Sequence, residues 1–156
     1  ELKFSPVLTT VTAARPHLSA SPGGGTVVNV NAVLARQPEP RLAATSAARA
    51  GLLNLTRTLA ADLAAEQIRV NSVLLGLIDT GQWRRRFDEQ KPVGPTGQPA
   101  SWEEWQADLA SDRGIGLGRL GTASEVSFVI TMLSSPRASY VTGTSIDVAG
   151  GVGRYV

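Results

Sequence analysis

The sequence predicts an α/β fold in which short parallel strands alternate with helices. Two short runs of mostly β-branched and aliphatic residues, 26–31 and 68–75, are typical of buried strands. The segment between them, 43–66, is rich in alanine and leucine and is long enough for a helix of several turns. A helix that connects two buried strands forms a βαβ unit. We therefore expect parallel strands and a right-handed crossover.

A further helix is predicted before this unit, over residues 5–18. Ser5 can act as its N-cap, with Pro6 at the first helical position, where a missing N–H costs no hydrogen bond. One face of this helix carries the apolar side chains of Val7, Leu8, Val11, Ala14 and Leu18. A loop rich in glycine and serine, 19–25, then leads into the first strand.

The second half of the chain begins with a polar segment, 82–98, for which we predict irregular structure. Two helix starts are then predicted by capping boxes, Ser101 with Glu104 and Thr122 with Glu125. Residues 145–148 form a last short strand, which two glycines end. The prediction is therefore three parallel strands with flanking helices.

The helix 43–66 has apolar positions that extend more than halfway round its surface. A helix of this kind is buried on two sides. We expect the sheet to cover one side and a second subunit to cover the other.

The composition excludes several classes of protein. The 42% of hydrophobic residues is enough for a core, and the 18% of charged residues is low for a disordered chain. The net charge is only +2 and the longest basic run is the three arginines at 84–86, so no nucleic-acid surface is expected. The chain has no cysteine, which excludes disulfides, and the single histidine, His17, leaves no histidine pair for a metal site.

No apolar run approaches the length of a membrane-spanning helix, and the first residues lack a basic segment followed by an apolar one. We therefore expect a cytoplasmic protein without a membrane span. The chain begins at Glu1 within a helical pattern, which is typical of a fragment.

Four segments carry a resemblance to a known family. They are SAARAGL at 46–52, IRVNSV at 68–73, LGRLGTASEV at 117–126 and TGTSIDVAGG at 142–151. In this order and spacing they are similar to motifs of the short-chain dehydrogenases/reductases, in the C-terminal half of that family's domain. The resemblance implies the C-terminal half of a doubly wound, Rossmann-like parallel sheet with flanking helices. Residues 1–156 would form this partial domain, without its N-terminal dinucleotide-binding half, and 82–121 would be its substrate loop or lid.

The family's catalytic residues are a Ser after the first of these strands, a Tyr thirteen residues later, a Lys four residues beyond the Tyr, and an Asn on the preceding helix. At the matching positions this chain has Ala32, Thr45, Arg49 and Lys3. All four differ from the family. The resemblance therefore implies the scaffold without the standard Tyr-based proton transfer.

Thr45 cannot replace the tyrosine directly. An aliphatic hydroxyl is a much weaker acid than a phenol, whose pKa is about 10. The threonine side chain is also shorter, so it does not reach a substrate oxygen in the same place. The alternative is that Thr45 is a helix residue that bonds to backbone or water. Ser46, beside it, has the same weak acidity and points elsewhere on the helix.

Arg49 keeps a cation at the lysine position, but a guanidinium stays protonated in proteins and does not exchange protons as a lysine can. It could bind a ribose hydroxyl or a phosphate, or it could be a plain surface residue. Together with Lys3 it would favour an anionic ligand in the cleft. Ala32 has no polar group. Asn31 is a possible substitute donor, although neighbouring strand residues point to opposite faces.

The resemblance also implies a nicotinamide cofactor, NAD or NADP. In the family, the loop after the second strand contacts the nicotinamide amide, and the matching residues here are Gly76, Ile78 and Thr80, with Arg49 at the ribose. Thr80 could instead cap the next helix. Residues 116–121 match a glycine-rich phosphate loop by letter, but no strand precedes them, so we interpret them as an ordinary loop.

Three hypotheses for the function remain open. The first is an NAD(P)-dependent oxidoreductase with an altered site that acts on a small-molecule substrate. The second is a catalytically inactive relative that binds a nucleotide or metabolite, and the third is a structural subunit. The family pairs subunits through the helices that correspond to 5–18 and 43–66, which implies a homodimer or homotetramer. Trp83, Trp102 and Trp105 lie in the lid segment, either as packing residues or for substrate recognition.

Overall fold

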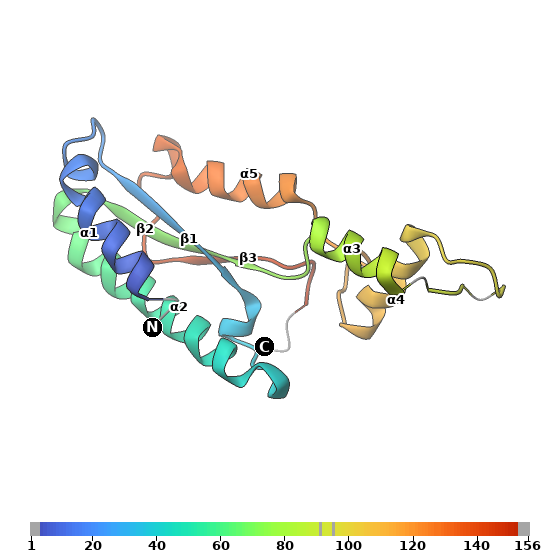
Figure 1. The fold of residues 1–156 in the computed structure, drawn as a ribbon. Coiled ribbons are helices and arrows are strands. Elements are labelled where there is room, and N and C mark those ends of the chain that lie inside the picture. Colours follow the sequence, from blue (N-terminus) through green and yellow to red (C-terminus); the bar gives the residue numbers. More distant parts are fainter. Residues whose placement is uncertain (1–3, 91, 95, 153–156) are drawn as a thin grey trace.

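The computed structural model describes residues 4–90, 92–94 and 96–152 and shows a three-stranded parallel sheet with the order β1-β2-β3 (Figure 1). The strands are β1 (Thr26–Ala32), β2 (Arg69–Leu75) and β3 (Ser145–Val148). β1 pairs with β2 from Thr26 opposite Arg69 to Ala32 opposite Leu75. The predicted fold class and the parallel pairing are confirmed.

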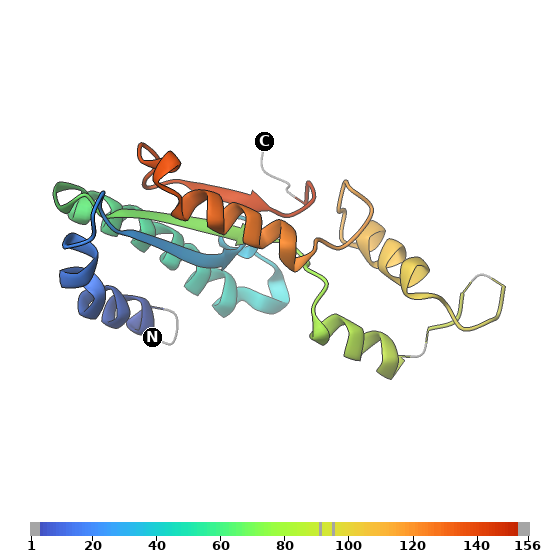
Figure 2. The same cartoon turned by 90° about the horizontal axis from the view of Figure 1, so that it is seen from above.

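The helices form one layer on each face of the sheet, with two further helices beyond the carboxyl ends of the strands (Figures 1 and 2). Their bounds are α1 (Ser5–Ser19), α2 (Ala43–Leu63), α3 (Gly81–Gln90), α4 (Trp102–Asp112) and α5 (Ala123–Ser134). Short 3-10 helices follow at Val33–Ala35, Pro40–Leu42, Ala64–Glu66 and Pro136–Ala138. α1 and α2 cover one face, and α5 covers the other.

β2 is the centre of the fold because both of its faces and both of its edges are covered. Val70, Val73 and Leu74 are completely buried between the helices on the two faces. The core continues from β2 into α1 and α2 through Val11, Ala60, Leu63 and Ile68. A strand covered on both faces needs apolar residues at consecutive positions, which explains the run recognised in the sequence.

Two details of the first helix differ from the prediction. The Ser5 N-cap is wrong, because the cap position is Phe4 and the N–H of Leu8 already bonds to the Phe4 carbonyl. The Phe4 ring packs against Gly51 of α2 so closely that a Cβ there would lie 2.5 Å from it, and this contact holds Phe4 in the first turn. Leu8 was expected on the apolar face but is 43% exposed.

The prediction of irregular structure over 82–98 is wrong for its first part, which is the helix α3 (Gly81–Gln90). Trp83 and Phe87 are one helical turn apart and form the apolar side of an otherwise charged helix. Their partners are Trp102 and Trp105 of α4, and the centroids of the Phe87 and Trp102 rings are 5.6 Å apart with edge-to-face geometry. The sequence did not indicate a helix here because only two apolar residues, Trp83 and Phe87, mark the side of α3 that packs against α4.

α3 and α4 therefore have a core of their own. All three tryptophans take part in it, and the Arg84 guanidinium lies 3.7 Å from the centroid of the Trp102 ring. Buried Ala110, Ile115 and Leu120 complete the cluster. Both predicted capping boxes are confirmed, at the starts of α4 and α5.

Within the described residues, no helix has both the length and the hydropathy needed to cross a bilayer. The same residues contain no group of three His, Asp or Glu side chains placed to hold a metal ion.

We expect the isolated 156-residue chain to be marginally stable. β1 pairs only with β2 among the described residues, so one edge of the sheet is uncovered. Val30, whose side chain points to the face opposite Asn29 and Asn31, is also 51% exposed. A free energy of unfolding below about 5 kcal/mol, or unfolding that depends on protein concentration, should appear in denaturant titrations combined with sedimentation. Cooperative unfolding of a stable monomer would contradict the prediction.

Candidate active site

The carboxyl ends of β1 and β2 lie side by side, with Ala32 opposite Leu75 in the strand register. Ligands of open parallel α/β sheets bind beyond this edge. Gly76 follows directly on β2, and α2 starts above the end of β1 because its chain returns antiparallel to the strands. Ala32, Arg49 and Gly76 therefore come to the same edge of the sheet.

The best-defined contact at this edge joins Asn31 to Arg49. The Asn31 amide nitrogen donates to the Arg49 carbonyl at 3.0 Å, and Arg49 Nη1 donates to Asn31 Oδ1 at 3.3 Å. Asn31 is 2% exposed, and its Oδ1 also accepts from the Ala32 N–H at 2.9 Å. Arg49 Nε is buried and has no hydrogen-bond partner among the described residues.

The other predicted catalytic positions are less constrained. Thr45 is half-buried and lies one helical turn before Arg49 on α2. Ser46 is buried, and its Oγ accepts a hydrogen bond from the Glu39 N–H at 3.4 Å, so its hydroxyl holds the loop before α2. Ala32 is half-buried, and Lys3 lies outside the described residues.

The predicted cofactor loop is tied to two other segments. The Gly76 N–H donates to the Val148 carbonyl, and a Cβ at Gly76 would lie 2.8 Å from Ala149 Cα. Ile78 is 8% exposed and forms a bridge with Gly121. A glycine is needed at position 76 because two backbone segments approach each other there.

Thr80 is exposed and directly precedes α3, and its carbonyl accepts from the N–H groups of Trp83 and Arg84. This position fits the alternative that Thr80 begins the next helix. Its side chain also remains accessible, so the cofactor role of Gly76, Ile78 and Thr80 stays a prediction.

The loop between β1 and α2 spans the same edge of the sheet and makes two ion pairs that the sequence did not suggest. Arg36 pairs with Asp147 of β3 at 2.9 Å, and Glu39 pairs with Arg113 after α4 at 3.4 Å. These partners are more than 70 positions apart along the chain, with separations of 111 and 74. No local pattern could have indicated such contacts.

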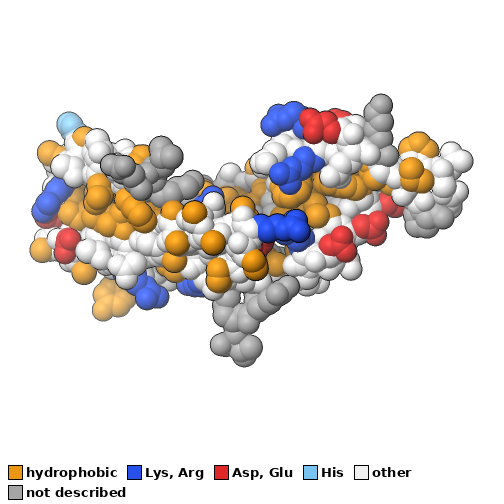
Figure 3. Space-filling view, turned by 60° about the horizontal axis from the view of Figure 1, so that its bottom comes forward, with side chains coloured by type: hydrophobic (Ala, Val, Ile, Leu, Met, Phe, Trp, Pro, Cys, Tyr) orange, Lys and Arg blue, Asp and Glu red, His pale blue; other side chains and the backbone are white. Residues whose placement is uncertain are grey.

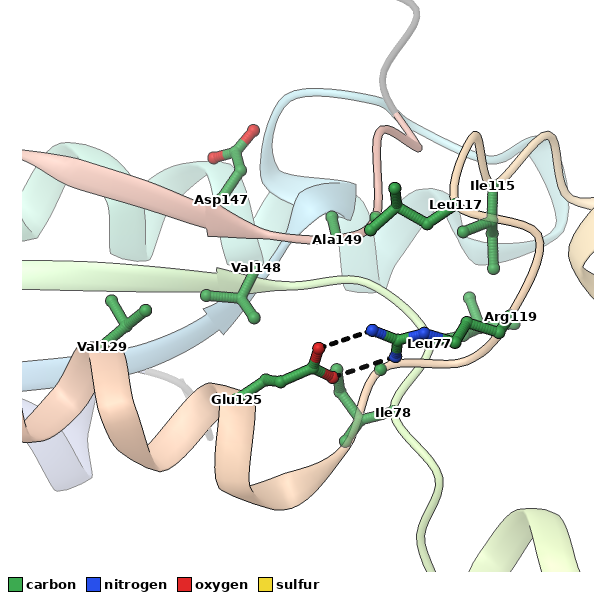
Figure 4. A pocket seen from close by; sticks show the side chains of 12 residues that line it. Leu77, Ile78, Ile115, Leu117, Arg119, Glu125, Val129, Asp147, Val148 and Ala149 are labelled. Atoms are coloured by element: carbon green, nitrogen blue, oxygen red, sulfur yellow. Dashed lines mark hydrogen bonds and ion pairs between the residues drawn. The ribbon is translucent and has the colours of Figure 1, made fainter.

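A cavity of about 270 Å³ lies between α5, the end of β3 and the loop 115–121 (Figure 4). Of the predicted site residues it includes only Ile78. Its other apolar walls include Leu77, Ile115, Leu117, Val129 and Val148. Figure 4 shows the Arg119 and Glu125 side chains paired at its opening, with Nη2–Oε1 and Nη1–Oε2 distances of 2.7 and 3.1 Å.

The Arg119 guanidinium lowers the pKa of the Glu125 carboxyl to about 2, because hydrogen bonds from Arg119 stabilise the charged form. The Thr122 N–H, which donates to the same carboxylate at 2.7 Å, acts in the same direction. Glu125 is therefore a charged wall of the cavity at neutral pH and also part of the capping box of α5.

The fold and this edge define an α/β protein with its candidate site at the carboxyl ends of parallel strands. The profile of the family described as enoyl-(acyl carrier protein) reductase matches residues 4–153. The chain belongs to the short-chain dehydrogenase/reductase family, as the four sequence motifs indicated.

Curated relatives support the same assignment. The chain is 38% identical over 135 residues to cis-4-hydroxycyclohexanecarboxylate dehydrogenase of Sinomonas cyclohexanicum, covering 86% of this chain and 47% of that protein. It is 29% identical over 138 residues to the 3-oxoacyl-acyl-carrier-protein reductase FabG of Chlamydia muridarum, covering 88% and 48%. The chain spans about half the length of the curated relatives it matches.

Solved structures show the same fold. A short chain oxidoreductase of Pseudomonas aeruginosa PAO1 with an atypical catalytic center, bound to NADPH, is 44% identical, with a TM-score of 0.88 over 99% of this chain and 56% of that one. Its apo structure has a TM-score of 0.91 and covers 57% of that chain. A putative 2-deoxy-d-gluconate 3-dehydrogenase of Agrobacterium tumefaciens with bound NADP is 29% identical, with a TM-score of 0.75 over 96% of this chain and 55% of that one.

We expect Glu125→Gln to destabilise the chain at neutral pH but not in strong acid. The folded-state pKa of Glu125 is about 2, below its ordinary value of 4.5, so its contribution is complete above about pH 4.5 and is lost as the pH falls through 2. Denaturation midpoints of the two proteins should therefore converge between pH 5 and pH 2, and high salt should also narrow the difference.

The exposed Glu89 provides a matched control for that experiment, because Glu89→Gln removes a surface carboxylate from α3 without touching Arg119 or the α5 capping box. A difference for Glu125→Gln that stays constant over the acidic range would contradict the prediction.

Proposed function

We propose that this chain supplies the C-terminal half of an NAD(P)-dependent oxidoreductase domain in which the Ser, Tyr and Lys positions carry Ala32, Thr45 and Arg49. The observation that carries the proposal is the placement of Arg49. Its guanidinium donates to Asn31 Oδ1 at the carboxyl end of β1, and the family resemblance assigns the lysine position to this residue. The substrate class is a small alcohol or carbonyl compound, in line with the dehydrogenases and reductases among its relatives.

The residues present fit part of a nicotinamide cofactor. Arginine has five N–H donors, and the hydrogen bond from Nη1 to Asn31 uses one of them, so Nη donors remain for ribose hydroxyls or a phosphate. Gly76, Ile78 and Thr80 would contact the nicotinamide end. Residues 116–121 form a loop without a preceding strand, so they do not provide a pyrophosphate site. The NADPH and NADP complexes of the Pseudomonas and Agrobacterium proteins support this cofactor class.

A bound nicotinamide cofactor would supply the hydride, and the residues of this chain would position and stabilise the reacting groups. Arg49 cannot act as the proton donor, because its guanidinium does not exchange protons near neutral pH. It can stabilise negative charge that develops on a substrate oxygen. Thr45 lies one turn away with a hydroxyl too weakly acidic to replace a phenol. The proton would therefore come from the substrate, the cofactor or water.

The atypical catalytic center of the Pseudomonas oxidoreductase favours the active-enzyme alternative over an inactive nucleotide-binding relative. Both the active enzyme and the inactive relative would bind the cofactor, so only a measurement of catalytic turnover distinguishes them. A cytoplasmic location of the protein also remains part of the proposal.

A homo-oligomer through α1 and α2 is a second proposal, and it rests on the outer surface of these helices. Only Val11 of α1 is buried, and the buried residues of α2 all lie on its sheet side. Leu8 and Leu42 are exposed on this part of the molecule, and Figure 3 shows hydrophobic side chains over much of the surface that includes α2. If the role of the chain is purely structural, it should form oligomers but should not bind the cofactor.

We expect the chain to bind NADPH or NADH and the Arg49→Met variant to bind it about tenfold more weakly, since a hydrogen bond to a charged group contributes about 1.5–3 kcal/mol. Thr45→Val should leave the affinity within about twofold. Enhancement of nicotinamide fluorescence during titration measures both. The intact mass is recorded first, since a mass well above 16.4 kDa would mean that further residues contribute.

Equal binding by the protein and Arg49→Met would remove Arg49 from the cofactor site. If the protein in the sample has a mass of 16.4 kDa and binds neither nucleotide, cofactor binding is not a property of this chain.

A further inference from the structure

We propose that Asn31 is a positioning residue that sets the orientation of the Arg49 guanidinium for its ligand. The inference rests on the proposed function, because the ligand is the ribose or phosphate of a nicotinamide cofactor. Asn31 itself is not expected to touch the cofactor. The sequence suggested Asn31 only as a substitute donor to substrate, and the structure assigns its hydrogen bonds to Arg49 instead.

The hydrogen bonds define which way the Asn31 amide faces. Its Oδ1 lies against two donors, the Ala32 N–H and Arg49 Nη1, and its Nδ2 lies against an acceptor, the Arg49 carbonyl. Reversing the amide would place donors against donors. One side chain therefore holds both the backbone and the guanidinium of the same arginine.

Burial explains why this orientation is persistent. Asn31 is 2% exposed on a short strand, and a buried amide is costly unless its hydrogen bonds are made. Arg49 Nε is also buried, with no hydrogen-bond partner in the described part of the chain, so the base of the guanidinium is enclosed as well. The buried amide is thus satisfied mainly by Arg49, and a shorter or apolar residue would leave the guanidinium free to rotate.

Asn29 is a matched comparison within the same strand. It points to the same face of the sheet and is 7% exposed, and its Nδ2 donates to Thr56 Oγ1 of α2 at 3.0 Å. Thr56 in turn donates to the Leu52 carbonyl. Asn29 therefore anchors α2 to β1 two helical turns away from Arg49, and it should share the structural effect of Asn31 without its effect on the guanidinium.

The first measurement follows Arg49 without any cofactor. In the whole chain labelled with 15N-arginine, the Nε–Hε signal of Arg49 is assigned by its disappearance in Arg49→Lys. Asn31→Ala should shift or broaden this signal, and Asn29→Ala should leave it in place. Asn31→Asp keeps an acceptor oxygen beside the guanidinium but loses the Nδ2 donor to the Arg49 carbonyl, so it should shift the signal without broadening it. If Asn31→Ala does not fold, Asn31→Leu, which fills the same volume, takes its place.

The second measurement is the affinity for NADPH. Asn31→Ala should weaken binding about fivefold, because the coupling energy between residues in contact is typically large enough for such a change in affinity. Asn29→Ala should weaken binding by less than about twofold, because Asn29 does not contact Arg49. In the Arg49→Met background, Asn31→Ala should have no further effect. If Asn31 had a purely structural role, Asn31→Ala should weaken NADPH binding by the same factor in the unmodified chain and in Arg49→Met.

The two measurements separate the failure of this inference from that of the proposed function. An Arg49 signal that is unchanged in both Asn31→Ala and Asn31→Leu overturns the positioning role, whatever the cofactor does. Additive effects of Asn31→Ala and Arg49→Met on NADPH affinity overturn it as well. If the signal moves but the unmodified chain binds neither NADPH nor NADH, Asn31 positions Arg49 and the proposed cofactor function is wrong.

Discussion

The hydrogen-bonded contact between β1 and α2 determines how the candidate site is assembled. Two buried asparagines on one face of the strand, Asn29 and Asn31, bind Thr56 and Arg49 of the helix. Apolar packing alone would allow a helix to slide or rotate on a sheet, whereas satisfied polar contacts in a buried layer allow one register. Once that register is set, helical periodicity places Thr45 one turn before Arg49, at the start of α2.

The stability of the fold does not come mainly from the side chains at positions 32, 45 and 49. Ala32, Thr45 and Arg49 are half-buried at the edge of the sheet, and the stability of the domain comes from the fully buried β2 and the contacts of α2. Substitution at such positions costs little stability. Different side chains can therefore occupy these positions while the scaffold stays the same.

The α3–α4 unit has its own aromatic core and stands apart from the sheet (Figure 2). It contacts the rest of the chain through Leu77 and Val152, which pack against its core, and through exposed ion pairs such as Glu39–Arg113. Exposed pairs of this kind contribute at most about 1 kcal/mol. Apolar packing therefore both keeps the unit together and attaches it to the rest of the chain.

The sequence by itself determined the three parallel strands, the long helix between the first two, and both capping boxes, because each depends on local periodicity or on residues three positions apart. Motif spacing also singled out Ala32, Thr45 and Arg49 as candidate site residues, and this assignment stays a prediction. Only the tertiary structure decided the partners of Asn31, the ion pairs Arg36–Asp147 and Glu39–Arg113, and the cavity beside α5. The helix α3 was missed because two aromatic residues among charges are a weak signal until α4 packs against them. Contacts between residues far apart in the chain are set by packing, and no local pattern encodes them.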